Sequence, residues 1–195
     1  LIFGVAVGNV LQGVPFQLND MLIPLYSCNF FIEFIALPSL FALLAGVVSI
    51  SMLMMHGAAW LTLKSEGPVQ FRAREIGSVA GMVAFVTYIL AGVWLSFGIK
   101  GYTITSVVPD NGPSNPLFST VEHGGSWLSA YSDRPWIAIA PILGLLGIAL
   151  ATMGLRAGRE GSTLLLSKRG IFGVIASVGW RMVPILLPGS IHPYA

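Results

Sequence analysis

Long apolar runs alternate with short polar segments along the whole chain. The runs cover residues 1–16, 37–63, 76–99, 136–155 and 170–187. Each run with polar residues on both sides is near the roughly 20 residues that a helix needs to cross a bilayer. Inside lipid the backbone amides have no water to bond, so a spanning segment satisfies them internally as a helix. The pattern therefore predicts an all-α fold, a polytopic transmembrane helix bundle with about five spans.

The composition agrees with a membrane protein and excludes a soluble one. Hydrophobic residues make up 55% of the chain and Asp, Glu, Lys and Arg only 9%, against roughly 25% charged residues in a soluble domain. The net charge is only +2, and the basic residues lie between the apolar runs, which argues against a nucleic-acid partner. The chain opens with Leu1 inside an apolar run. We expect residues 1–195 to form a single membrane domain, part of a larger subunit that is truncated at both ends.

Prolines and small residues add detail to the predicted spans. Pro141 and Pro184 lie inside apolar runs and are expected to bend their helices, which membrane bundles tolerate. Small residues at helical spacing let helix backbones approach closely in lipid, and they favour a packed bundle over separate anchors. The residues concerned are Ala42, Gly46 and Ser49, then Gly77 and Gly81, and finally Gly170, Gly173 and Ser177.

The distribution of basic residues predicts the orientation. The segments 64–75 and 156–169 are expected to be loops on one side of the membrane, and the segments 17–36 and 100–135 loops on the other. The first pair carries seven basic residues and the second pair only two, Lys100 and Arg134. Because positive residues stay on the cytoplasmic side, the two short basic loops are predicted to be cytoplasmic. The seven residues are Lys64, Arg72, Arg74, Arg156, Arg159, Lys168 and Arg169.

Candidate chemistry is sparse, and no catalytic or nucleotide-binding motif is present. His56 lies inside the second run, and a histidine at membrane depth is a functional candidate by default. Three roles are open for it: contact with a quinone or a transferred proton, ligation of a haem, or a hydrogen bond between helices. Haem ligation by two histidines needs a second buried histidine, and His192 lies outside the last run. The helix-packing role is favoured over the other two.

Two further sites have a plain interpretation and an alternative. Arg181 lies inside the fifth run, where a charge is costly unless it is paired or extends to the interface. We expect it to extend outward, with a lipid head group or a partner carboxylate as the alternative. Glu122 and His123 are adjacent in the last outer segment, but a metal site needs three or four converging ligands. No metal site and no catalytic residue is predicted.

Several stretches resemble a known family. The run from Gly4 to Phe16, GVAVGNVLQGVPF, closely resembles the motif in subunit II of cytochrome bd oxidases where a membrane helix continues into an outer loop. The resemblance extends, with gaps, over essentially the whole chain. The further matching stretches are residues 29–31, 43–49, 57–58, 63–64, 91–94, 98–99, 101–102, 114–117 and 127.

The resemblance implies a role in aerobic electron transport. The family is a quinol:oxygen oxidoreductase of bacterial inner membranes, in which haems b558, b595 and d are carried by subunit I. Subunit II is a haem-free helical partner that is not catalytic on its own, and some members hold a quinone as a structural element. The resemblance therefore implies that this chain binds no haem itself, and that its partners are the haem-bearing subunit I, quinol at the level of the complex, and the lipid bilayer.

The chain also departs from the family. Lys168, Arg169 and Arg181 stand where the family has an apolar helix, which leaves the start of the fifth span open. The competing interpretation is a multi-span membrane transporter, since transporters place charges and broken helices near the middle of the membrane. His56, Arg181 and the two internal prolines give limited support to that alternative.

Overall fold

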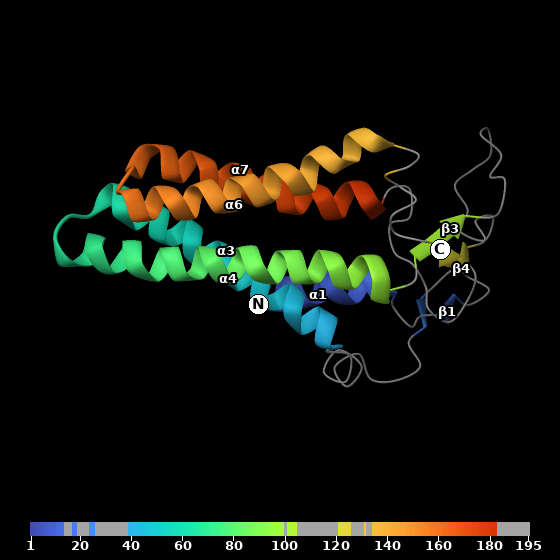
Figure 1. Cartoon of the computed structure of the whole chain (residues 1–195). Helices are drawn as coiled ribbons and strands as arrows, with labels where there is room; N and C mark the ends of the chain where they lie inside the picture. The colour runs from blue at the N-terminus through green and yellow to red at the C-terminus, as the bar shows by residue number, and fades with distance from the viewer. Residues whose placement is uncertain are drawn as a thin grey trace.

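The structure, a computed structural model, describes residues 1–13, 17–18, 24–25, 39–99, 101–104, 121–125, 131 and 134–182. Helices dominate the described part and form an antiparallel bundle (Figure 1), which confirms the predicted all-α membrane fold. The helices are α1 (Ile2–Gln12), α3 (Leu40–Lys64), α4 (Pro68–Gly98), α6 (Ile139–Ala157) and α7 (Glu160–Met182), with the 3-10 helix η2 (Pro135–Ala138) directly before α6.

Two short strand pairs that the apolar pattern did not predict accompany the helices. Strands β1 (Gln17–Leu18) and β2 (Pro24–Leu25) pair in antiparallel fashion between α1 and α3. Strands β3 (Gly101–Ile104) and β4 (Val121–Gly125) pair in the same way between α4 and η2. Both pairs lie beyond the bundle at the end opposite to its short turns (Figure 1). They give the polar segments between helices some regular structure.

The ends of the helices follow local sequence signals. The side chain of Ser39 accepts a hydrogen bond from the backbone N–H of Ala42 at 3.1 Å and so caps the start of α3. Gly67 has φ of 67°, and Pro68 starts α4, where a missing N–H costs nothing. Gly158 ends α6 in the left-handed region with φ of 69°, a conformation in which glycine is not strained.

Three helices in the described part are long and apolar enough to cross a membrane: Leu40–Lys64, Pro68–Gly98 and Pro135–Ala157. They correspond to the second, third and fourth predicted spans. The third span begins earlier than predicted, because α4 starts at Pro68 and carries Arg72 and Arg74 in its first two turns. The predicted loop 64–75 is therefore wrong over most of its length.

The fifth predicted span also needs correction. Helix α7 begins at Glu160, ten positions before the predicted start at Gly170, so the predicted loop 156–169 is reduced to a turn around Gly158. Lys168 and Arg169 lie inside this helix. A helix bonds its own backbone whatever its side chains are, so charges alone do not interrupt it. The predicted continuation to Leu187, with Pro184, lies outside the described residues.

Pro141 lies inside the fourth span, as predicted, near its start. It is the third residue of α6, directly after η2, and a proline is tolerated in the first turn of a helix. Just before Pro141 the backbone changes from the 3-10 helix η2 to the α-helix α6. The bend predicted at this proline stays a prediction.

The bundle is held together by close approach of small residues. Between α6 and α7, Gly144 lies against Gly173, and Gly147 lies against Gly170. Between α1 and α3, a Cβ atom built on Gly8 would come within 2.7 Å of the Cα atom of Ala42. The predicted role of small residues in packing is thus confirmed at these interfaces. A further buried cluster joins the helices at the centre: Met52, Met55, Ala59, Ala80, Ala84, Ile148, Ala151, Leu155, Leu164 and Val174.

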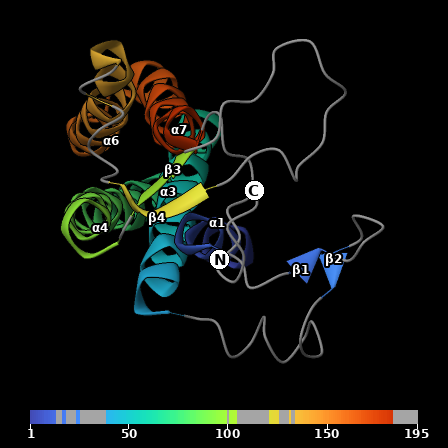
Figure 2. The same cartoon turned by 90° about the vertical axis from the view of Figure 1, so that its right-hand side faces the viewer.

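Helix α3 is central to the arrangement. It contacts α1, α4 and α7, while α6 packs mainly on α7 and α4. Figure 2, which looks along the bundle, shows α6 and α7 side by side and α1 against α3 on the side away from them. The segments that join α3 to α4 and α6 to α7 lie at one end of the bundle (Figure 1). We refer to this end, with Glu66 and Gly158, as the basic end.

Candidate intramembrane polar sites

His56 of α3 lies near the basic end and faces α7. Its Nδ1 atom is 2.8 Å from the hydroxyl oxygen of Ser167. The same hydroxyl donates to the carbonyl of Leu164 at 2.9 Å. The direction of the bond between His56 and Ser167 follows the tautomer of the imidazole. The histidine thus joins α3 to α7.

A second contact of the same kind lies further along α7. The hydroxyl of Tyr88, on α4, is 2.8 Å from the hydroxyl oxygen of Ser177, and Ser177 donates to the carbonyl of Val174 at 2.7 Å. Either hydroxyl can be the donor in the bond between Tyr88 and Ser177. Both serines are buried and bond to a ring group on a neighbouring helix. Ser177 was predicted only as a small packing residue, and Tyr88 was not predicted at all. The signal that could have identified Tyr88 is a tyrosine inside an apolar run.

Arg181 lies near the other end of the bundle from His56, so the two candidate residues do not share a site. Its Nε atom donates to the hydroxyl of Tyr131 at 2.8 Å, and its guanidinium carbon lies 4.6 Å from the centre of the same ring. The rings of Trp136 and Trp180 meet edge to face at 5.1 Å close by. Aromatic residues of this kind typically lie at a membrane interface. Arg181 therefore has a partner within the chain at the outer rim of the bundle.

The basic end carries a polar cluster that joins three helices. Glu160, in the first turn of α7, accepts from Arg74 at 2.7 Å and from the side chain of Gln70 at 2.6 Å. Gln70 also donates to the backbone carbonyl of Thr62 at the end of α3. A carboxylate at a helix N-terminus is favoured by the helix dipole. Both charged side chains are about one-third exposed, so this ion pair contributes only modestly to stability.

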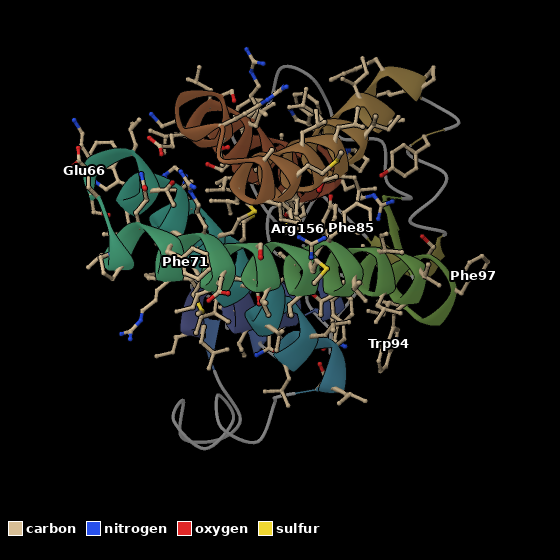
Figure 3. All side chains as sticks on the ribbon, turned by 60° about the vertical axis from the view of Figure 1, so that its left-hand side comes forward. Glu66, Phe71, Phe85, Trp94, Phe97 and Arg156 are labelled. Carbon is tan, nitrogen blue, oxygen red and sulfur yellow. The ribbon has the colours of Figure 1, made fainter. Side chains whose placement is uncertain are left out.

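The outer side of the bundle is apolar. Figure 3 shows Phe71 and Phe97 at the surface of α4, and they are 62% and 85% exposed, whereas the ring of Trp94 meets that of Phe41 on α3 edge to face at 6.5 Å. Arg156, at the end of α6, lies across α4, with Nη2 at 3.0 Å from the sulfur of Met82 (Figure 3). Exposed apolar side chains in this arrangement suit contact with lipid or another membrane protein.

No group of three or more potential metal ligands occurs in the part of the chain that the structure describes. Glu122 and His123 lie in β4, where they pair with Thr103 and Tyr102 of β3. His192 lies outside the described residues.

Comparison with known proteins decides the family. The profile of the family described as cytochrome bd terminal oxidase subunit II matches residues 1–195. The chain belongs to this family. This confirms the resemblance seen in the sequence and favours an oxidase subunit over a transporter.

Two bacterial relatives of this subunit II chain show how much of the protein it represents. It is 37% identical to the probable cytochrome oxidase subunit 2 of Haemophilus influenzae over 194 residues, which is 99% of the chain and 50% of that relative. It is 36% identical to the cytochrome bd-I ubiquinol oxidase subunit 2 of Escherichia coli strain K12 over 191 residues, 97% of the chain and 49% of that relative. The chain thus spans about half the length of the relatives it matches.

Proposed function

We propose that the chain is part of the non-haem subunit of a bacterial respiratory terminal oxidase that oxidises quinol and reduces oxygen to water. In this role it supports a haem-bearing subunit I in the cell inner membrane and is not catalytic on its own. The observation that carries the proposal is the family match over residues 1–195, together with a relative whose name specifies a ubiquinol oxidase subunit.

The packing of the helices supports a structural role. Gly147 meets Gly170 and Gly144 meets Gly173 at backbone distance, so α6 and α7 leave no space for a planar macrocycle between them. His56 is the histidine within the described helices, so these helices do not supply the two histidines that bis-histidine ligation needs. We propose that haems b558, b595 and d belong to the partner subunit, and that any quinone held by subunit II is a structural element.

We propose further that His56 acts mainly as a hydrogen-bonding residue between α3 and α7. The contact with Ser167 at 2.8 Å supports this role, because polar side chains commonly join helices within lipid. The alternative is contact with a quinone or a transferred proton through the second ring nitrogen. The basic end is proposed to face the cytoplasm, on the distribution of positive charge.

The proposal is tested with the full-length protein, produced with and without its haem-bearing partner. A reduced-minus-oxidised spectrum is expected to show haem in the co-purified complex and none in the single subunit. Oxygen consumption with quinol as donor should likewise need both subunits. A stoichiometric Soret band in the isolated subunit would overturn the proposal, and so would stable purification alone as a species that transports a solute.

A further inference from the structure

One face of α7 carries two positive charges in an otherwise apolar stripe. Lys168 and Arg169 are both exposed, and Leu165, Phe172 and Ile175 on the same face are 57%, 63% and 63% exposed. The face is open along its whole length within the described part of the chain. A Cβ atom built on Gly161 or on Gly179, near the two ends of the helix, would meet no heavy atom within 4 Å.

The packing of α7 on α6 fixes the depth of these charges. Gly173 lies against Gly144 and Gly170 against Gly147, so in this antiparallel register Lys168 is level with Ala149. The apolar run of α6 ends at Arg156, which is about 10 Å of helix beyond Ala149. Lys168 and Arg169 therefore lie level with the apolar part of α6, on the side of the basic end.

No acidic side chain of the described helices neutralises the two cations. The carboxylates in and between these helices are Glu66 in the turn between α3 and α4, Glu75 in α4 and Glu160 at the start of α7. Glu160 already forms an ion pair with Arg74. A cation at membrane depth without a counter-charge is costly, so an anion from outside these helices is expected to approach the face.

The direction of the side chains indicates where that anion lies. Every Cα–Cβ bond of a helix tilts toward the helix N-terminus, and long side chains extend the same way. The N-terminus of α7, at Glu160, is at the basic end. Lys168 and Arg169 therefore lean toward the nearer membrane surface, where lipid phosphates lie.

We propose that Lys168 and Arg169 bind the head group of an anionic phospholipid in the leaflet at the basic end. The guanidinium of Arg169 suits two-point bonding to a phosphate, and Lys168 supplies a second charge from the adjacent position. The acyl chains extend away from the surface over Phe172 and Ile175. Basic positions between or on helices near the cytoplasmic surface are a known type of site for acidic lipids.

The test uses the assembled oxidase in nanodiscs, so it does not depend on how the oxidase activity is shared between subunits. One set of nanodiscs contains only phosphatidylcholine, and the other set contains phosphatidylcholine with phosphatidylglycerol. The lipid retained after detergent extraction is counted by native mass spectrometry. The wild type is expected to retain phosphatidylglycerol. The double variant Lys168→Leu, Arg169→Leu should bind it about thirty-fold more weakly, since two basic contacts are lost.

Matched variants separate this site from general surface charge. Arg72→Leu removes an exposed cation from α4 at the same end and should leave retention unchanged. Lys168→Arg keeps the charge and should also retain the lipid. This variant keeps the proposal testable if the double variant fails to assemble. The proposal is overturned if Arg72→Leu releases as much lipid as the double variant, or if Lys168→Arg releases the lipid. It is also overturned if inorganic phosphate raises the melting temperature of the detergent-solubilised oxidase as much as phosphatidylglycerol does. Cross-linking of Lys168 to a protein carboxylate would also overturn it.

Discussion

At the scale of single residues, polar groups inside this bundle are satisfied by pairing across helices. Ser167 bonds to His56 on α3, and Ser177 bonds to Tyr88 on α4. Each serine also lies within hydrogen-bond distance of the carbonyl three residues earlier on α7. Sequence analysis found His56 and Arg181 because both are conspicuous in apolar runs. It could not find their partners, since the partner of His56 depends on the register of helices that are 111 residues apart in the chain.

The bond between His56 and Ser167 can be measured as a coupling energy. His56→Phe and Ser167→Ala, alone and combined, form a double-mutant cycle read by unfolding of the complex in mixed micelles. We expect a coupling of about 0.6 kcal/mol, and below about 1.7, as is usual for hydrogen bonds between membrane helices. Ser162→Ala is the matched control, because the Ser162 hydroxyl is exposed and donates to the carbonyl of Arg159, the residue directly before the same helix.

The same variants decide between the roles open for His56. If the histidine is a packing residue, His56→Phe and Ser167→Ala should lower stability together while turnover per assembled oxidase stays near the wild type. A coupling energy near zero, with a large loss of turnover in His56→Phe alone, would instead favour the quinone or proton role.

At the scale of helices, glycines mark where backbones nearly touch and where they do not. A Cβ atom on Gly81 of α4 would lie 3.1 Å from the sulfur of Met55 and closer still to the hydroxyl of Thr152. In contrast, one on Gly92 of the same helix would meet nothing within 4 Å. Spacing alone predicted close contact at Gly81, but only the arrangement of the helices distinguishes it from Gly92.

Gly81→Leu is therefore expected to impair assembly, and Gly92→Leu is the matched control. Forcing a side chain into a filled interface costs about 1–3 kcal/mol. Blue-native gels and the haem d absorbance of membranes should show less assembled oxidase for Gly81→Leu and a near-normal level for Gly92→Leu.

A second pair on α3 repeats the comparison. A Cβ atom on Gly46 would lie 2.8 Å from a methyl group of Val5, and one on Gly57 meets nothing within 4 Å. Gly46→Leu should therefore lower assembly more than Gly57→Leu. Equal effects within either pair would show that these glycines do not mark helix contacts.

At the scale of the whole molecule, the apolar runs predicted the order of the helices that the structure describes. They failed where charge was used to place loops. Arg72, Lys168 and Arg169 all lie in helices, because a helix can extend beyond the membrane or carry a cation whose side chain leans toward the surface. The strand pairs β1–β2 and β3–β4 were missed, since each consists of at most five residues per strand in polar segments without clear alternation.

Labelling of introduced cysteines tests the orientation of the bundle. In a Cys28→Ser background, a cysteine at Glu66 in the α3–α4 turn is expected to be protected from an impermeant reagent added outside intact cells. One at Asn111, in the predicted outer segment, should react. The expectation rests on the excess of basic residues near the turns. Opening the cells should expose the cysteine at Glu66, which controls for reactivity. The reverse labelling pattern would invert the proposed topology.

The short turn between α6 and α7 bears on how the protein enters the membrane during synthesis. Helix α6 belongs to a stretch that is apolar enough to span, Pro135–Ala157, whereas α7 is not among the candidate spans. A helix carrying Lys168, Arg169 and Arg181 should therefore partition poorly by itself at the translocon. Because α7 is joined to α6 by a short turn and packs on it through glycines, the two helices can enter the membrane together as a helical hairpin. In a glycosylation-based insertion assay, α7 alone should insert weakly and the α6–α7 pair efficiently, and Gly147→Leu should reduce insertion of the pair. Efficient insertion of α7 alone would show that biogenesis does not depend on this hairpin.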